Sequence, residues 1–289
     1  MKVCLQCHQH FESRQWICPH CFSTPAMVNG HYRLTVELAD ASSGYEAAFF
    51  SELFDLEAQN FWFRSRNQLI IWALQHYFPS AKNFLEIGCG TGYVLSGLET
   101  AFPHLKLSGS ELFSEGLAFA AQRLSTVELL QMDARNMPFR EEFDVIGSFD
   151  VLEHIADDIA VLEAIYNAAR PQGGVILTVP QHAWLWSHAD TYAHHVRRYS
   201  AQDLITKLNQ LNFKVLRVTS FVSLLLPLMM ASRRLQQRPN PNYTVMSELK
   251  ISRSMNFVLE TVLNLERAMI QRGISFPLGG SLLVVAQKL

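Results

Sequence analysis

The chain has 289 residues, of which 49% are apolar and 17% are charged, and its formal net charge is −2. This composition is typical of a packed globular protein with one or two domains, and it excludes a disordered chain. A net charge near zero argues against a wide face that binds a polyanion, although local basic patches are compatible with it. The longest apolar run, Phe221–Met230, is about half of the ~20 residues that span a bilayer, and Pro227 interrupts it.

Two Cys-x-x-Cys pairs open the chain, with ten residues between them: Cys4 and Cys7, then Cys18 and Cys21. Four thiolates at this spacing can converge on one tetrahedral zinc ion, and two disulfides are the alternative. The segment has too little apolar mass to fold alone, so a metal would supply the missing stability. No apolar leader precedes the cysteines, so we expect a cytoplasmic chain with reduced thiols. We therefore predict a structural zinc ribbon and linker over residues 1–38.

The stretch Ala39–Tyr45 has the weakest apolar pattern and is expected to link the ribbon to a catalytic domain over residues 39–289. A helix is predicted from Asn60 to Phe78. Its first turns carry two arginines two positions apart, which point to different sides of a helix, so only one can readily face a site. We name Trp62 and Arg64 as candidate substrate-binding residues; the alternative is a solvated amphipathic helix with Trp62 in the core.

The segment Phe84–Gly92 is typical of a strand that runs into a glycine-rich loop, and an apolar helix, Tyr93–Phe102, follows. Such a loop brings bare backbone N–H groups and a helix N-terminus against a ligand. The glycines stand at every second position, whereas the dinucleotide fingerprint places its third glycine one residue later. Glu86, two residues before the first glycine, is also foreign to that fingerprint. The glycines are Gly88, Gly90 and Gly92.

The next three predicted strands, over 104–110, 127–132 and 143–149, each precede a carboxylate: Glu111, Asp133 and Asp150. Ligands of open α/β sheets bind at the carboxyl ends of the strands. Glu111 lies about 20 residues past the glycine loop, where an acid accepts hydrogen bonds from both ribose hydroxyls. It also suits the N-terminus of a helix predicted at 112–121, and both roles are compatible.

The pattern from Glu86 to Gly92 resembles motif I of class I methyltransferases that use S-adenosylmethionine (SAM). The run from Phe143 to His154 is similar to motif IV, and Pro171–Pro180 is similar to the family's entry into its fifth strand. The resemblance implies a doubly wound, Rossmann-like, seven-stranded and mostly parallel sheet. It also implies that Asp133 bonds the adenine and that the chain at Asp150 passes beneath the methionine part of SAM. The implied cofactor-binding residues are Glu86, Gly88, Gly90, Gly92, Glu111, Asp133, Ala134, Phe149 and Asp150.

The end of motif IV offers one candidate base. Asp150-x-x-Glu153-His154 resembles the acid-x-x-Glu-His cluster of quinone-biosynthesis O-methyltransferases, some of which use a divalent metal there, although this chain has Asp in place of the first Glu. The alternative is that Glu153 and His154 cap a helix beginning near Ala156. A hydroxyl or amine acceptor must lose a proton, so we name His154 and His195 as candidate catalytic bases.

The segment Gln181–Ser200, past the fifth strand, is crowded with tryptophan, histidine and arginine. Loops over the strand carboxyl ends carry substrate contacts, so we expect this segment to select the acceptor. Ser200 is a predicted N-cap for a helix to Leu211, with Asp203 at N3, so part of the polar density is structural and an arginine could tie the segment to a carboxylate. The candidate substrate-binding residues here are Trp186, Arg197, Arg198 and Tyr199.

The last two predicted strands, 213–220 and 281–286, form a hairpin in the minimal fold, with the seventh strand inserted antiparallel. Here a helical insertion at about 221–280 separates them, including a helix over 245–272. The apolar run and the arginines at 233, 234 and 238 are interpreted as a helix that caps the core or a pocket. The alternative is peripheral membrane contact through residues 221–238.

We therefore predict a SAM-dependent methyltransferase that acts on an O or N atom of a small or lipid-linked molecule. An RNA methyltransferase is the alternative, because a four-cysteine module ahead of this fold resembles the bacterial ribosomal RNA guanine methyltransferases. Only Lys2 and Arg14 are fixed cations within residues 1–24, too few for a phosphate footprint, so nucleic acid is disfavoured. A SAM-binding regulator without catalysis is disfavoured by the intact motifs.

Overall fold

A computed structural model describes residues 1–13, 15–35, 47–235 and 250–289. The predicted linker Ala39–Tyr45 lies outside the described residues. The same holds for Arg238 and for the first five residues of the helix predicted at 245–272.

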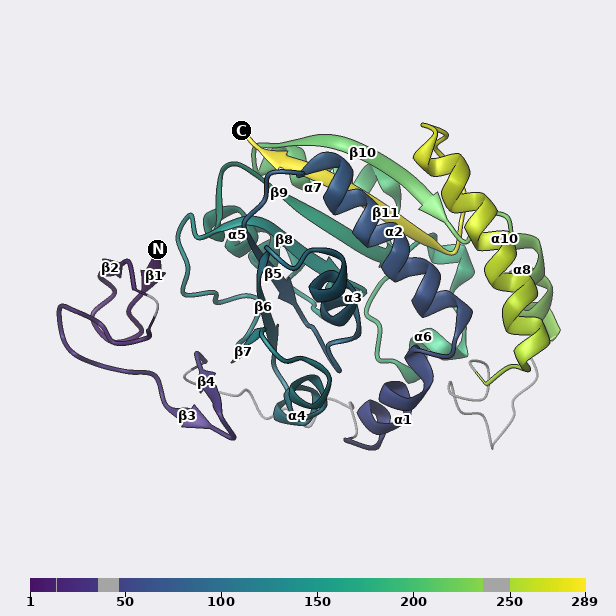
Figure 1. The fold of residues 1–289 in the computed structure, drawn as a ribbon. Helices are drawn as coiled ribbons and strands as arrows, with labels where there is room; N and C mark the ends of the chain where they lie inside the picture. Colours follow the sequence, from purple (N-terminus) through teal and green to yellow (C-terminus); the bar gives the residue numbers. More distant parts are fainter. Residues whose placement is uncertain (14, 36–46, 236–249) are drawn as a thin grey trace.

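Among the described residues, nine strands form the central sheet (Figure 1): β3 (Met27–Val28), β4 (His31–Arg33), β5 (Asn83–Ile87), β6 (Lys106–Glu111), β7 (Glu128–Gln131), β8 (Phe143–Phe149), β9 (Ala169–Pro180), β10 (Phe213–Phe221) and β11 (Ser281–Lys288). Their order is β10-β11-β9-β8-β5-β6-β7-β4-β3. From β9 to β4 the neighbours are parallel, and β11 lies antiparallel between β9 and β10. The predicted mostly parallel sheet with an antiparallel last strand is confirmed.

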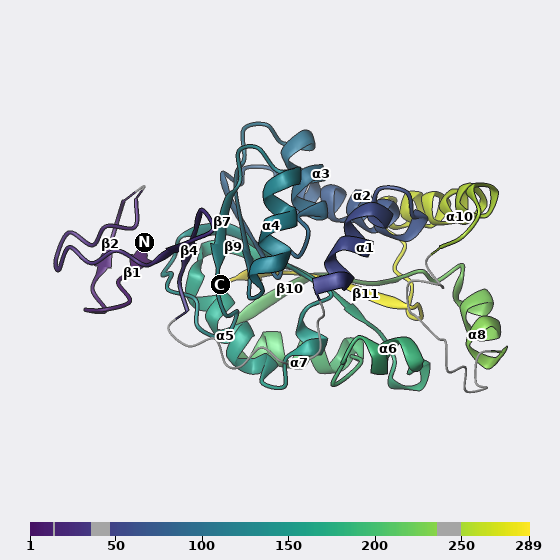
Figure 2. The ribbon, with the colours of Figure 1, turned by 90° about the horizontal axis from the view of Figure 1, so that it is seen from below.

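Helices cover both faces of the sheet (Figure 2). One face carries α1 (Ala47–Glu57), α2 (Phe61–Tyr77), α3 (Tyr93–Ala101), α4 (Ser114–Arg123) and α10 (Arg253–Gln271). The other carries α5 (Asp158–Ala168), α6 (His188–Tyr192) and α7 (Ala201–Gln210), and α8 (Leu226–Leu235) lies beyond the ends of β10 and β11. Each layer has its own buried apolar cluster, one including Leu74 and Leu95 and the other Ile165 and Leu204. The central strands are therefore buried on both sides, which explains their nearly continuous apolar sequences.

Local capping chemistry sets two helix starts that the sequence predicted. The side chain of Asn60 accepts a hydrogen bond from the N–H of Trp62 at 2.9 Å and begins α2. Ser200 Oγ accepts from the N–H of Asp203 at 3.1 Å and begins α7. Each cap satisfies a backbone donor that the first helical turn leaves without a partner.

The N-terminal region is joined to the sheet more closely than predicted. β1 (Lys2–Val3) and β2 (His10–Phe11) form a separate hairpin, but β3 and β4 extend the central sheet beyond β7, so the sheet has nine strands instead of seven. The N–H of Leu34 donates to the carbonyl of Gln131 at 2.8 Å. Trp16 is buried against Phe139, with ring centroids 5.5 Å apart. Strands of two and three residues are too short to show an alternating pattern in sequence.

The insertion between β10 and β11 contains α8 and α10. The apolar run begins at Phe221, the last residue of β10, and continues into α8. Pro227 lies in the first turn of α8, where a proline removes no helical hydrogen bond. The Glu266 carboxylate of α10 accepts hydrogen bonds from the N–H groups of Ser223 and Leu224, both at 2.7 Å, and so holds the turn that precedes α8. Among the described residues, no helix combines the length and the hydropathy needed to cross a bilayer.

Candidate functional site

The glycine loop joins β5 to α3 in a backbone conformation that favours glycine. Gly88, Gly90 and Gly92 have φ values of 64°, 51° and 75°. A Cβ on Gly88 would lie 2.5 Å from Cγ2 of Val151, whereas a Cβ on Gly90 would meet nothing within 4 Å. Packing and φ therefore require glycine at 88. At 90 the loop also presents an open face, as the approach of a ligand to bare backbone requires.

Glu111, at the end of β6, is buried beside this loop. Its carboxylate accepts hydrogen bonds from the N–H groups of Gly90 at 3.0 Å, Leu112 at 2.8 Å and Phe113 at 3.2 Å. Burial raises the pKa of Glu111, and these three donors oppose that rise. The carboxylate thus stands both at the glycine loop and ahead of α4, so the structure accommodates the ribose role and the helix-terminus role together.

Glu86 lies inside β5 and is almost fully buried. Its Oε2 has no hydrogen-bond partner among the described residues. Burial raises the pKa of Glu86 well above its usual range, although the charge of Arg66 acts in the opposite direction. A buried carboxyl oxygen with an unmade hydrogen bond is costly, which marks it as a position where a ligand donor would fit.

The arginine that faces the site is Arg66, in place of Arg64, the one predicted from the sequence. Arg66 is buried, forms an ion pair with Asp150, and stacks its guanidinium over Trp62 at 4.5 Å from the ring centroid. Arg64 instead forms a bidentate pair with Glu260 of α10, at 2.8 and 2.6 Å. The sequence shows that the two arginines diverge, but only the packing of α2 shows which one turns inward.

The acids after β7 and β8 occupy the expected strand ends. Asp150 has φ 58°, which is unusual for a non-glycine residue, and Thr178 holds it through its carbonyl at 2.8 Å and its hydroxyl at 3.1 Å. Phe149 is buried just before it. Strained backbone of this kind is concentrated at functional sites.

Asp133 pairs with Arg135 at 2.6 Å, and Ala134 beside it is buried. Partial burial would raise the pKa of Asp133, but the hydrogen bonds and charge of Arg135 outweigh it and lower the pKa. Asp133 is thus held as a carboxylate, able to accept hydrogen bonds from a ligand.

A cluster of Glu153, His154 and His195 lies next to this strand end. Glu153 and His154 form a short 3₁₀ turn (Leu152–His154), so the expectation that they cap the next helix is wrong; the N-cap of α5 is Asp157. The rings of His154 and His195 meet edge to face at 4.7 Å between centroids. Burial and the neighbouring His195 lower the pKa of His154 to about 3. Burial raises the pKa of Glu153 well above its usual range.

The same three side chains could approach a metal ion. Their candidate ligand atoms lie within 4.8 Å of one another, and Nε2 of His195 is 4.0 Å from Oε1 of Glu153. Bonds of about 2.1 Å to a metal place neighbouring ligand atoms roughly 3.0–3.4 Å apart. The His195–Glu153 separation is wider than that, and it is also longer than a hydrogen bond, so these two side chains do not hydrogen-bond to each other.

A buried carboxylate, Asp190, organises the segment after β9. It accepts from Nδ1 of His195 at 3.0 Å and from Nε and Nη2 of Arg198 at 2.7 and 3.0 Å. Burial alone would raise the pKa of Asp190, but these partners outweigh it and hold the pKa far below its usual range. Arg198 is therefore a brace within the protein, and its assignment to substrate binding stays a prediction.

A second buried carboxylate, Asp158, engages two more of the predicted substrate residues. Arg197 pairs with it at 2.7 Å, and the Tyr199 hydroxyl donates to it at 2.7 Å. Tyr199 is fully buried, and burial together with Asp158 raises its pKa far above its usual range. Tyr199 is therefore closed to a substrate in this arrangement, whereas the Arg197 side chain is 27% exposed and remains partly accessible. Trp186 is 42% exposed and remains accessible.

One part of the site has no precedent in the sequence patterns. Glu57, at the end of α1, accepts hydrogen bonds from Oγ1 of Thr91 at 2.5 Å and from Nη1 of Arg123 at 2.7 Å. Thr91 belongs to the glycine loop, so this hydrogen bond ties the loop to the end of α1. The three residues are far apart in the chain, and no local spacing signals their contact.

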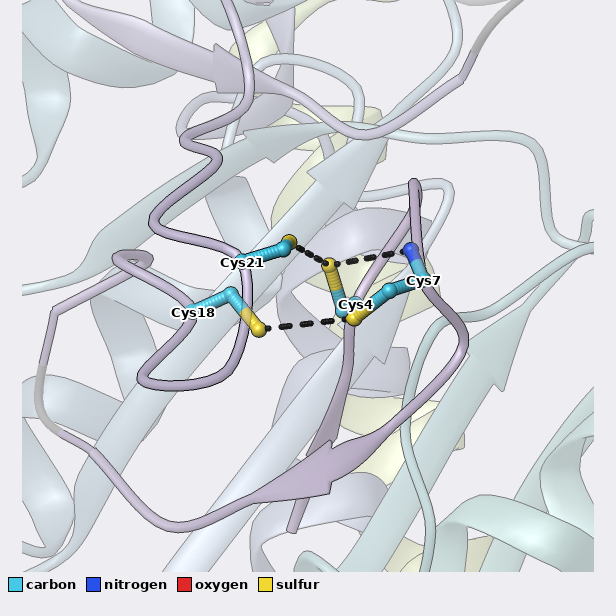
Figure 3. A group of neighbouring side chains, drawn as sticks. All are labelled: Cys4, Cys7, Cys18 and Cys21. Atoms are coloured by element: carbon cyan, nitrogen blue, oxygen red, sulfur yellow. Dashed lines mark hydrogen bonds between the residues drawn. The ribbon is translucent and has the colours of Figure 1, made fainter.

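The four N-terminal cysteines converge (Figure 3). Sγ of Cys4 lies 3.6 Å from Sγ of Cys21, Sγ of Cys7 lies 3.7 Å from Sγ of Cys18, and all four sulfurs fall within 4.8 Å of one another. None of them forms a disulfide. Zinc–sulfur bonds of about 2.3 Å in a tetrahedron require sulfurs about 3.8 Å apart, so the geometry fits the predicted zinc ion and not the alternative of two disulfides.

The family model described as "Methyltransferase domain" matches residues 54–218. A Mycolicibacterium smegmatis protein named "Probable S-adenosylmethionine-dependent methyltransferase" is 25% identical over 163 residues, which cover 55% of this chain and 62% of that protein. A ubiquinone biosynthesis O-methyltransferase of Paraburkholderia phymatum is 30% identical over 113 residues, covering 37% of this chain and 48% of the enzyme. The chain thus spans about half to three fifths of the length of these relatives.

Solved structures share the fold. The phosphoethanolamine N-methyltransferase 2 of Haemonchus contortus, in complex with S-adenosyl-L-methionine, superposes with a TM-score of 0.57 at 18% identity, covering 86% of this chain and 58% of that one. An O-methyltransferase family protein from Burkholderia thailandensis gives a TM-score of 0.55 at 12% identity, with coverages of 84% and 60%.

Proposed function

From the premise that this chain belongs to the methyltransferase domain family and is a SAM-dependent methyltransferase, we propose that it methylates an O or N atom of a small or lipid-linked acceptor. The observation that carries the proposal is a juxtaposition at the carboxyl ends of the strands. The open glycine loop backed by Glu111 follows β5, and the braced imidazole of His195 packs against His154, just past the end of the neighbouring strand β8.

The chain's own atoms fit SAM. The open face at Gly90 admits a ligand, and the buried Oε2 of Glu86 lacks a partner among the described residues. Glu111 would accept from the ribose hydroxyls with its remaining lone pairs, Asp133 and Ala134 would contact the adenine, and Phe149 and Asp150 would line the methionine part. When bound, SAM supplies a methyl group carried on a positively charged sulfonium. The main task of the protein is to align that methyl with the acceptor atom.

Within this proposal His195 is the base. Asp190 stays ionised, so the proton of the neutral imidazole resides on Nδ1 and Nε2 is left to take a proton from the acceptor. His154 has a pKa of about 3 and is a weak base. Of the two candidates named from the sequence, we therefore assign proton removal to His195, and we assign to His154 the packing that fixes the His195 ring.

The acceptor class rests on two observations. The matched relatives include O-methyltransferases that are named for ubiquinone biosynthesis. The accessible Trp186 offers an apolar surface to the body of an acceptor. The RNA alternative receives no support from the matched relatives.

We also propose a structural role for zinc bound by Cys4, Cys7, Cys18 and Cys21. Four thiolates on one ion would stabilise a segment with little core of its own. We keep the division into a ribbon with linker over residues 1–38 and a catalytic domain over 39–289, although β3 and β4 pair with the catalytic sheet.

The test is to trace label from methyl-labelled methionine in a strain that lacks the gene. We expect one labelled small or lipid-extractable metabolite to disappear, to return with the wild-type gene, and not to return with His195→Gln, although purified His195→Gln still binds SAM. Complementation with His104→Gln, which changes an exposed histidine, should restore the metabolite. Label lost from the RNA fraction instead, or full rescue by His195→Gln, would contradict the proposal.

A further inference from the structure

The helix α10 has an uncharged solvent-facing side. At about 100° per residue, its exposed positions from Phe257 round to Met255 span an arc of roughly 160°. The side chains on that arc are all apolar or small and uncharged: Ser254, Met255, Phe257, Val258, Thr261, Val262, Leu265, Ala268 and Met269. The buried residues of the helix, such as Leu259 and Leu263, lie outside the arc.

Four large apolar side chains on this arc are exposed to solvent. The exposed fractions are 48% for Met255, 71% for Phe257, 54% for Val258 and 58% for Leu265, and we call these four residues the outer face of α10. Leu228 of α8, at the same end of the molecule (Figures 1 and 2), is 55% exposed. Single exposed apolar residues are ordinary, but several on one helix indicate a contact surface.

The charges around the outer face of α10 are one-sided. Its two acids serve the protein itself: Glu260 pairs with Arg64, and Glu266 holds the turn before α8. Arg253 and Arg272, at the two ends of the helix, are exposed. Lys250 pairs with Glu52, and at about 100° per residue Arg267 lies on the opposite side of the helix, so Arg253 and Arg272 are the cations that flank the outer face.

We propose that the outer face of α10 docks on the surface of an anionic lipid bilayer. An apolar helix face flanked by basic residues inserts its side chains at the headgroup boundary while the cations meet acidic headgroups. A second copy of this chain would be a poorer occupant, because a two-fold contact brings the same basic flanks together. The proposal goes beyond the proposed function and shifts the membrane contact expected at 221–238 to α10.

The surface lies next to the site. Asn256 Oδ1 of α10 accepts from the N–H of Phe61 at 2.8 Å, and Glu260 holds Arg64, so α10 is fixed to the first turns of α2. Those turns carry Arg66, which stacks on Trp62 and pairs with Asp150 at the end of β8. A bilayer bound at the outer face of α10 would thus lie near the site, a placement that suits a lipid-linked acceptor.

The test is co-sedimentation of the full chain with phosphatidylcholine vesicles, with and without phosphatidylglycerol. We expect binding only to the anionic vesicles, weakened by raised salt, and a loss of about tenfold or more in the partition coefficient for Phe257→Ser/Val258→Glu. Phe22→Ser, which changes a phenylalanine that is 78% exposed on the N-terminal region, is the matched control and should bind like the wild type. Thermal melts and SAM titration check that each variant is folded.

Several outcomes would overturn the docking proposal. These are no binding to anionic vesicles, equal binding by the wild type and Phe257→Ser/Val258→Glu, or a wild-type dimer in light scattering that this double variant converts to monomer without vesicle binding. Because SAM affinity is measured on the same samples, failure of docking is distinguishable from failure of the methyltransferase assignment.

Discussion

The glycine loop and the segment 181–200 both border the site, but they are built in different ways. In the glycine loop the functional groups are backbone N–H donors on an open face. The glycines serve here because they have no side chain to block a ligand. In the segment 181–200 the side chains are dense, and many of them bind one another. Asp190 alone engages His195 and Arg198, and Asp158 engages Arg197 and Tyr199.

This difference shows why a crowd of polar residues is weak evidence for substrate contact. A buried arginine beside a carboxylate has its charge neutralised within the protein, and Arg198 uses three of its five N–H donors on Asp190 and on the carbonyl of Gln181. The contribution of Asp190 is positional, because it fixes the imidazole of His195 through a hydrogen bond to Nδ1. The glycine loop should therefore control cofactor affinity, and the carboxylate braces should control stability and the acceptor step.

The largest expected effect is on stability. Asp190→Ala leaves Arg198 buried without its partner, so the free energy of unfolding should fall by about 3–5 kcal/mol. The double variant Asp190→Ala/Arg198→Met should recover much of that loss. Urea denaturation of the three proteins measures it. A single variant as stable as the wild type would show that the brace is not structural.

The next largest effect concerns the cofactor. Glu111→Ala removes a charged acceptor at the glycine loop and should weaken SAM binding by about 1.5–3 kcal/mol, as measured by calorimetry. Glu115→Ala, which changes a neighbouring acid on α4, is the control and should leave the affinity unchanged. Equal affinities for all three proteins would remove Glu111 from the cofactor site.

A smaller effect is expected in the pH dependence of stability. The pKa of His154 is lowered to about 3 in the folded protein, against about 6.5 in the unfolded chain. Between these two pH values only the unfolded state binds this proton. The contribution of His154 to the free energy of unfolding is therefore full above pH ~6.5 and falls by about 1 kcal/mol per pH unit as the pH decreases. His154→Gln should flatten this slope in urea melts between pH 6.5 and 4.5, and His104→Gln should not. If the slope is unchanged in His154→Gln, His154 is not the group responsible for the pH dependence of stability in this range.

The smallest effect on stability should come from Trp186→Ala, because that side chain is exposed. We expect a change within about 0.5 kcal/mol in the free energy of unfolding, together with a raised KM for the acceptor once it is identified. A large loss of stability would show that Trp186 belongs to the braces and not to the acceptor surface.

The sequence predicts those functional features that depend on residues close together in the chain. Glycines with positive φ, acids at strand ends and caps such as Ser200 are specified by neighbours within a few residues. It does not predict contacts between distant segments. The inward turn of Arg66, the link from Glu57 to Thr91 and the pairing of β4 with β7 all depend on how separate elements pack.

The four-cysteine region shows the same limit. The spacing of Cys4, Cys7, Cys18 and Cys21 predicts their convergence, which the structure shows. It gives no sign that Trp16 packs on Phe139 or that the following strands join the sheet. The linker composition suggests separation, whereas the packing joins the two parts.

The most direct test of the account is a double-mutant cycle on SAM affinity with Glu111→Ala and His195→Gln. Calorimetry should show tight binding by the wild type, the same loss from Glu111→Ala in both backgrounds, and no loss from His195→Gln alone, because the loop and the brace are independent. If the wild type failed to bind SAM, or if His195→Gln weakened binding as much as Glu111→Ala, the division of labour between the glycine loop and the segment 181–200 would be contradicted.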